Sequence, residues 1–151
     1  MLEAIDQARV KHEFHLWAYV LMPEHVHMLI WPTRHEYSIS QILASLKVPV
    51  SRRALAHVRA KAPEFLSQME DCEPNGTIQF RFWQRGGGFD RNITEPTTIW
   101  AEIDYIHANP PRRGLCERAI EWPWSSAAEY EFPGTGLLKI DRESLPIDER
   151  G

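Results

Sequence analysis

The sequence predicts an α+β fold that begins with a short helix and a β-hairpin and continues with further helices. Two runs rich in aromatic and branched residues, Phe14–Met22 and His25–Trp31, are joined by so short a link that they are expected to pair as a hairpin. Helical spacing of apolar residues follows in the stretch after Ser38 and again in Thr97–Ala108. No parallel βαβ unit is visible, which argues against a doubly wound nucleotide-binding fold.

The first half of the chain carries clear helix signals. A short helix is expected over Leu2–Val10. Ser38 can cap the next helix, with Gln41 at its third position, as in a capping box. Pro49 is expected to end or kink that helix, and a second, basic helical stretch is expected from Val50 to about Lys61.

The second half begins with a predicted strand at Thr77–Trp83, which is followed at once by Gly86-Gly87-Gly88. The glycines do not have the spacing of a dinucleotide motif or a P-loop, so no nucleotide cofactor is expected. A helix is predicted over Thr97–Ala108, with Thr94 as its cap and an end before Pro110-Pro111.

Composition restricts the class of protein. With 151 residues, 43% hydrophobic content and six tryptophans, the chain is expected to be one soluble globular domain, and no apolar run is long enough to span a bilayer. Acidic residues near Met1 do not fit a secretory signal, so a cytoplasmic location without a membrane partner is expected. Cys72 and Cys116 are too few for a disulfide framework and are expected to be free thiols.

The net charge of −4 is unevenly distributed. Five basic and no acidic residues lie between Lys47 and Lys61, whereas four acids lie between Asp141 and Glu149. The basic segment is compatible with a nucleic-acid-binding strip and equally with an ordinary solvated helix face.

A histidine pair is the first candidate for chemistry. In a strand, His25 and His27 would point to the same side, with Cα atoms roughly 6.5–7 Å apart, so both rings could bind one divalent cation. Two histidines that simply face solvent are the competing interpretation.

The predicted helix Thr97–Ala108 holds the second candidate. Its isoleucines share one face, whereas Tyr105 lies well away from that face with Asn109 beside it, one turn later. A tyrosine next to an amide is a candidate for catalysis. An exposed tyrosine and an ordinary asparagine at a helix end would have the same pattern.

Four motifs in order resemble those of one protein family. They are Leu21–His27, Phe82–Asn92, Asp104–Leu115 and Trp122–Ser126, and together they span roughly residues 14 to 130. This set resembles the REP-associated tyrosine transposases, which are relatives of the single-tyrosine HUH transposases.

The resemblance implies a ferredoxin-like antiparallel sheet with helices on one face, and an enzyme that nicks single-stranded DNA near hairpin-forming repeats. In that family Tyr105 would be the nucleophile that forms a 5′-phosphotyrosine. His25 and His27 would bind Mg²⁺ or Mn²⁺, and Asn109 matches the position of a third metal ligand. The phosphotyrosine bond conserves the energy of the broken phosphodiester, so strand transfer would need no ATP.

The expected partner is single-stranded DNA with a hairpin, bound by a monomer or homodimer. Basic side chains near the predicted site and on the basic helix could contact phosphates. These residues are Arg52, Arg53, Arg59, Arg85, Arg112 and Arg113. Two other functions stay open: a catalytically impaired, host-adopted hairpin-binding protein, and a small metal-binding module unrelated to nucleic acid.

The domain prediction is a single transposase-like domain over residues 1–132 and a loosely ordered tail over 133–151. Family members usually begin with a strand before the first helix, whereas this sequence starts at or inside the helix. The sheet would then be completed differently, the gene start would lie further upstream, or the product would be a truncated remnant. Pro111 replaces an aliphatic residue that is common in the family.

Overall fold

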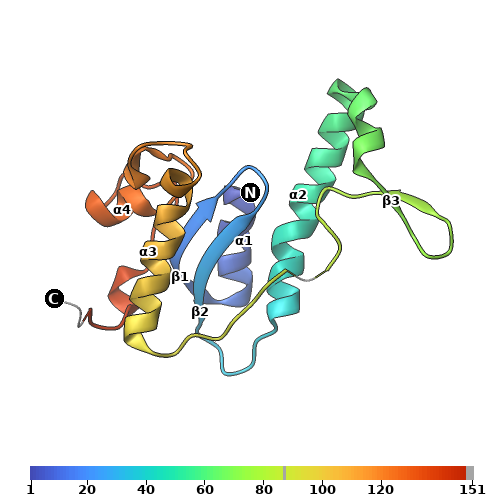
Figure 1. Ribbon diagram of the computed structural model, residues 1–151. Helices are drawn as coiled ribbons and strands as arrows, with labels where there is room; N and C mark the ends of the chain where they lie inside the picture. Colours follow the sequence, from blue (N-terminus) through green and yellow to red (C-terminus); the bar gives the residue numbers. More distant parts are fainter. Residues whose placement is uncertain (87, 149–151) are drawn as a thin grey trace. The chain divides into compact units, whose positions relative to one another are not determined.

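The computed structural model describes residues 1–86 and 88–148. Helices and two small antiparallel sheets alternate along the chain, so the predicted α+β class is confirmed (Figure 1). The main elements are α1 (Leu2–His12), β1 (Phe14–Leu21), β2 (Val26–Pro32), α2 (Ile39–Lys61), β3 (Glu70–Cys72), β4 (Ile78–Phe80), α3 (Pro96–Arg112) and α4 (Ala127–Glu131). Short 3₁₀ helices are η1 (Pro63–Met69), η2 (Ala119–Glu121) and η3 (Arg142–Ser144).

The chain forms two compact units, and this division does not follow the predicted boundary at residue 132. Unit 1 comprises Met1, Glu3–Ala8 and Ser38–Phe89. Unit 2 comprises Leu2, Arg9–Tyr37 and the chain from Asp90 onward. Residues of α1 are therefore assigned to both units.

Unit 2 is organised by the antiparallel hairpin of β1 and β2. Leu21 pairs with Val26 and Val20 with His27, and the backbone N–H of Met22 donates to the carbonyl of His25 at 2.9 Å. Because this hydrogen bond closes the turn, β2 begins at Val26 and not at His25 as predicted.

Helix α3 packs against β1 and supplies three of the seven residues of the buried cluster in unit 2 (Figure 1). The spacing of its three buried isoleucines follows the predicted apolar face. Burial of this face removes apolar surface from water at roughly 25 cal/mol per Å², which fixes α3 on the hairpin. The buried cluster consists of Trp17, Ala18, Val20, Met22, Ile99, Ile103 and Ile106.

The edge of β1 that does not pair with β2 is covered by segments from the C-terminal part of the chain. Ser126 donates its backbone N–H to the carbonyl of Tyr19, and the Tyr19 N–H donates to the Ser126 hydroxyl at 3.0 Å. Further along the strand, the Asp141 carboxylate accepts from the Leu16 N–H at 2.8 Å, and Ile140 is buried. The described part of the predicted loose tail, residues 133–148, therefore packs on β1, while 149–151 lie outside the described residues.

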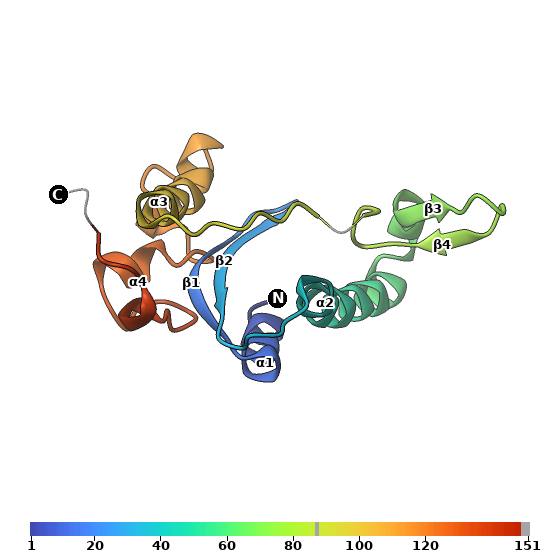
Figure 2. The same cartoon turned by 90° about the horizontal axis from the view of Figure 1, so that it is seen from below.

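Unit 1 contains the long helix α2 and the β3–β4 hairpin (Figure 2). Ser38 caps α2 as predicted, since its hydroxyl accepts from the Gln41 N–H. The expected helix end at Pro49 is wrong, because α2 continues through this residue to Lys61, and the alternative expectation of a kink stays a prediction. The predicted strand Thr77–Trp83 is shorter in the structure, and Gly87 of the glycine run lies outside the described residues.

The ends of α3 also differ from the prediction. The N-cap is Glu95 and not Thr94, and the helix continues through Pro110 and Pro111 to Arg112. Pro110 is fully buried, so packing offsets the backbone hydrogen bond that a proline cannot donate. None of the helices in the described part of the chain combines the length and apolar character needed to cross a membrane.

Candidate active site

The two predicted metal-binding histidines lie together at the start of β2. Although His25 is in the turn and His27 in the strand, their ring centroids are 4.8 Å apart and their planes are nearly perpendicular, at 84°. The turn thus brings together two imidazoles, which are common ligands of divalent metals.

Tyr105 reaches this pair from α3. Its ring lies edge-on to His27, with centroids 5.8 Å apart and an angle of 82° between the planes. The side chain is 43% exposed, as its position away from the isoleucine face predicts. A partly exposed tyrosine whose ring contacts His27 can be approached by a large substrate.

Asn109 follows Tyr105 by one turn of α3. Its side-chain Nδ2 donates to the carbonyl of Tyr105 at 2.8 Å, so the amide oxygen is the atom that could coordinate a cation. Within residues 1–86 and 88–148, no cluster of three or more His, Cys, Asp and Glu side chains forms a metal site. A site here would therefore depend on the two imidazoles with an amide or solvent as further ligands.

The electrostatic surroundings favour neutral His27. Burial, with the positive charge of a protonated His25 as a second cause, lowers the pKa of His27 below its ordinary 6.5, and Glu102 opposes the shift. A lowered pKa keeps the ring unprotonated at neutral pH, so that a nitrogen lone pair is available to a metal. This donor set fits a divalent cation.

Two arginines at the end of α3 border the site. The guanidinium of Arg112 lies over the Tyr105 ring, 5.4 Å from its centroid, in a cation–π contact. Arg113 Nη2 lies 2.5 Å from Glu24 Oε1. Burial would raise the pKa of Glu24, but the hydrogen bond from Arg113 and nearby positive charge lower it overall, so the carboxylate is ionised at neutral pH.

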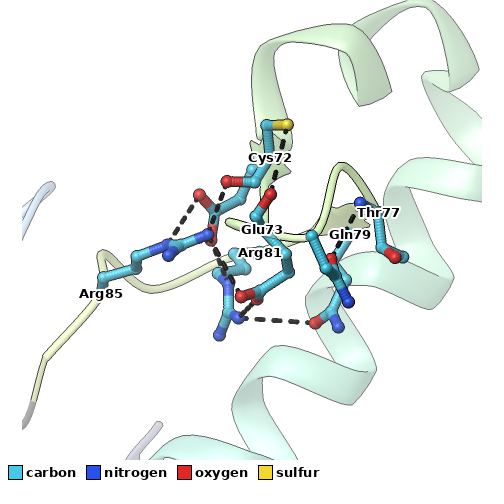
Figure 3. A network of polar contacts seen from close by, with 8 residues as sticks. Cys72, Glu73, Thr77, Gln79, Arg81 and Arg85 are labelled. Carbon is cyan, nitrogen blue, oxygen red and sulfur yellow. Dashed lines mark hydrogen bonds and ion pairs between the residues drawn. The ribbon is translucent and has the colours of Figure 1, made fainter.

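The remaining arginines predicted to bind DNA lie in unit 1 and differ in their partners. Arg53 is paired with Glu3, and Arg85 donates to both carboxylate oxygens of Asp71. Figure 3 shows Arg85 in this polar network, next to Cys72 and Glu73. Neither Arg52 nor Arg59 forms an ion pair with another residue of the described ranges. The first pair of arginines is thus neutralised locally, whereas the second pair is available to an anion.

Sequence reasoning missed Glu24 as part of the site. The residue stands directly before His25, but its partner Arg113 lies far along the chain. Because the sequence predicts that the helix ends before Pro110, it does not indicate that Arg113 would lie close to Glu24. His107, by contrast, packs inside unit 2, with Nε2 2.8 Å from the Ser126 hydroxyl. Trp122 also serves the fold, because its indole N–H donates to the Leu21 carbonyl.

An α+β fold that places two histidines of a hairpin beside a tyrosine of a packed helix has the arrangement that the motifs imply for single-tyrosine HUH enzymes. Two comparisons found proteins of one family to which the chain is similar. No protein-family model matches the chain.

The chain is 25% identical over 123 residues to a protein of Haemophilus influenzae with the provisional name REP-associated tyrosine transposase. The match covers 82% of this chain and 64% of that protein. The fold is similar to a solved structure of a REP-associated tyrosine transposase bound to a REP hairpin, with a TM-score of 0.54 and 20% identity. That match covers 88% of this chain and 66% of the other.

The resemblance to the REP-associated tyrosine transposases is thus confirmed by both comparisons. In each case the chain spans slightly less than two thirds of the length of the protein that it matches.

Proposed function

We propose that this protein is a metal-dependent, single-strand-specific DNA endonuclease and strand transferase that acts near hairpin-forming repeats. The observation that carries the proposal is the cluster of His25, His27 and Tyr105, in which a nucleophile and two metal-ligand side chains meet at an exposed surface. The similarity to REP-associated tyrosine transposases supports DNA as the substrate.

Tyr105 would supply the nucleophile. Its Oη attacks the scissile phosphorus, a bond forms between Oη and the 5′ phosphate, and the bond from phosphorus to the 3′ oxygen breaks. The phenolic proton is lost to solvent, and the departing 3′ oxygen gains a proton to become a free hydroxyl. Attack by that hydroxyl on the phosphotyrosine reverses the step, so rejoining or transfer to another strand requires no nucleotide cofactor.

The histidines would hold Mg²⁺ or Mn²⁺, with Asn109 as a third ligand. When bound, the cation would offset negative charge on the non-bridging phosphate oxygens. Neutral imidazole ligands leave the charge of a cation undiminished, and the lowered pKa of His27 agrees with that role. Arg112 would keep the Tyr105 ring in place through the cation–π contact.

A single substitution tests the proposal. With Mn²⁺ and a labelled hairpin that carries a single-stranded flank, the unaltered protein should form a covalent protein–DNA species, visible on a denaturing gel. Tyr105→Phe should abolish this species, because the attacking oxygen is removed, while hairpin binding changes less than about twofold. Chelation of the metal should have the same effect, and restored Mn²⁺ should recover the product in the unaltered protein only.

The same assay distinguishes the alternatives. Hairpin binding without a covalent species would favour an adopted DNA-binding protein. A covalent species that persists in Tyr105→Phe would overturn the assignment of the nucleophile. Metal binding without affinity for the hairpin at low salt would exclude both DNA functions.

A further inference from the structure

An ion pair joins the end of α3 to the turn between β1 and β2. Arg113 is the C-cap of α3, and its backbone N–H donates to the carbonyls of Asn109 at 3.1 Å and Pro110 at 3.2 Å. From this fixed position its Nη2 reaches Glu24 Oε1 at 2.5 Å. The helix that carries Tyr105 is thus tied directly to the turn that carries His25.

The same carboxylate oxygen also faces His25. Glu24 Oε1 lies 3.7 Å from His25 Nδ1, within ion-pair range but longer than a hydrogen bond. One oxygen of Glu24 is therefore near both the guanidinium and the imidazole. If this contact shortened to hydrogen-bond distance, Nδ1–H of His25 would donate to the same oxygen that Arg113 holds.

We propose that Glu24 and Arg113 are positioning residues that set the tautomer and orientation of His25. Arg113 holds the carboxylate, the carboxylate accepts a hydrogen bond from Nδ1–H of His25, and Nε2 is left without a proton toward the metal position. The inference rests on the proposed function and deepens it, because it assigns to Arg113 a role at the metal site instead of the predicted contact with DNA phosphate.

General chemistry supports this arrangement. Histidines that ligate metals usually donate their second ring N–H to a carboxylate or a carbonyl, and loss of that partner typically weakens metal affinity 10- to 100-fold. The planar guanidinium suits a fixed carboxylate better than a flexible lysine does. Because the side chains of Arg113 and Glu24 are 55% and 49% exposed, the pair should add little to stability. The ion pair should instead affect the tautomer and orientation of the His25 ring.

The direct test reads the His25 tautomer by NMR of the imidazole nitrogens in the metal-free full chain at neutral pH. The unaltered protein should have mainly the Nδ1–H form. Glu24→Ala and Arg113→Gln should both increase the Nε2–H form, whereas Arg113→Lys should restore part of the original population. Glu131→Ala is the matched control, because it removes a similarly exposed pair, Arg118–Glu131, from another part of unit 2.

The second readout is affinity for Mn²⁺, measured by calorimetry on the same variants. We expect about tenfold weaker binding in Glu24→Ala, about threefold in Arg113→Gln and no change beyond about 1.5-fold in Glu131→Ala. A His25 tautomer that stays the same in both Glu24→Ala and Arg113→Gln would overturn the inference. So would equal loss of Mn²⁺ affinity in the Glu131→Ala control.

Failure of the proposed function gives a different result. In that case the unaltered protein forms no covalent species with DNA and does not bind Mn²⁺. The tautomer measurement needs neither metal nor DNA, so it decides the role of Glu24 and Arg113 toward His25 independently.

Discussion

His107 is a part-buried titratable residue of unit 2. Burial lowers its pKa from 6.5 to about 4, with a small opposing effect from Asp104, and its Nε2 contacts the Ser126 hydroxyl. Ser126 in turn exchanges hydrogen bonds with the backbone of Tyr19 in β1. Protonation of His107 would therefore place a charge beside the contact that covers the edge of β1.

The lowered pKa of His107 predicts that unit 2 loses stability at acidic pH. His107 binds a proton near pH 6.5 in the unfolded chain but only near pH 4 in the folded chain. Its contribution to the free energy of unfolding is therefore fully present above pH 6.5 and decreases as the pH falls toward 4. The loss attributable to this residue at pH 5 should be about 2 kcal/mol. Amide hydrogen exchange of β1, measured at pH 7 and pH 5, gives the opening free energy.

His107→Gln is the matched variant, because it keeps a polar side chain opposite Ser126 but cannot titrate. Its opening free energy should change between pH 7 and pH 5 by about 2 kcal/mol less than that of the unaltered protein. Identical pH profiles for the two proteins would contradict a lowered pKa at His107.

At the scale of elements, the hairpin and the helices could be predicted from the sequence, but the helix ends could not. The two runs of aromatic and branched residues and the spacing of Ile99, Ile103 and Ile106 report local burial, so β1, β2 and α3 follow from them. Pro49 and Pro110 are strong local stop signals, yet both lie inside helices. Pro110 is fully buried, so that packing outweighs its lost hydrogen bond there.

The same distinction applies to the candidate site. His25, His27 and Tyr105 carry recognisable residue types and motifs, so the sequence could nominate them. The contact between Glu24 and Arg113 depends on α3 continuing past Pro111, which no local pattern indicates. Tertiary structure determines which charged side chains pair, so these partners cannot be predicted from the spacing of residues in the sequence.

Pro49 offers a test of the cost of a proline inside α2. Pro49→Ala adds a backbone N–H to the helix interior, where proline is about 3 kcal/mol less favourable than alanine. We expect unit 1 to gain about 1–3 kcal/mol, measured as slower amide exchange along α2. Pro63→Ala is the control, because Pro63 lies in the first turn of η1, where the missing N–H costs little.

No gain in Pro49→Ala, or an equal gain in Pro63→Ala, would contradict this account. The first result would mean that the Pro49 ring makes packing contacts worth as much as the lost hydrogen bond. Pro49 borders an open cavity of about 420 Å³ together with Met1, Val50 and Phe82, so its surroundings are not tightly filled. That observation favours a net gain.

At the scale of the whole molecule, charge determines how the proposed DNA binding should respond to salt. The chain has a net charge of −4, so any attraction to DNA depends on local groups of cations. Of the six arginines predicted to contact DNA, Arg53, Arg85 and Arg113 are paired with carboxylates. The other three are Arg52, Arg59 and Arg112.

Three available arginines predict a shallow salt dependence. Each phosphate neutralised on duplex DNA contributes about −0.9 to the slope of log affinity against log salt, so hairpin binding should have a slope of about −2 to −3. Arg52→Ala with Arg59→Ala should reduce its magnitude by about 2, whereas Arg53→Ala with Glu3→Ala should change it by less than about 0.5. Fluorescence anisotropy with a labelled hairpin between 50 and about 300 mM KCl measures both slopes. A slope near −6, with equal effects of the two double variants, would mean that DNA displaces the carboxylate partners and that all six arginines contact phosphate.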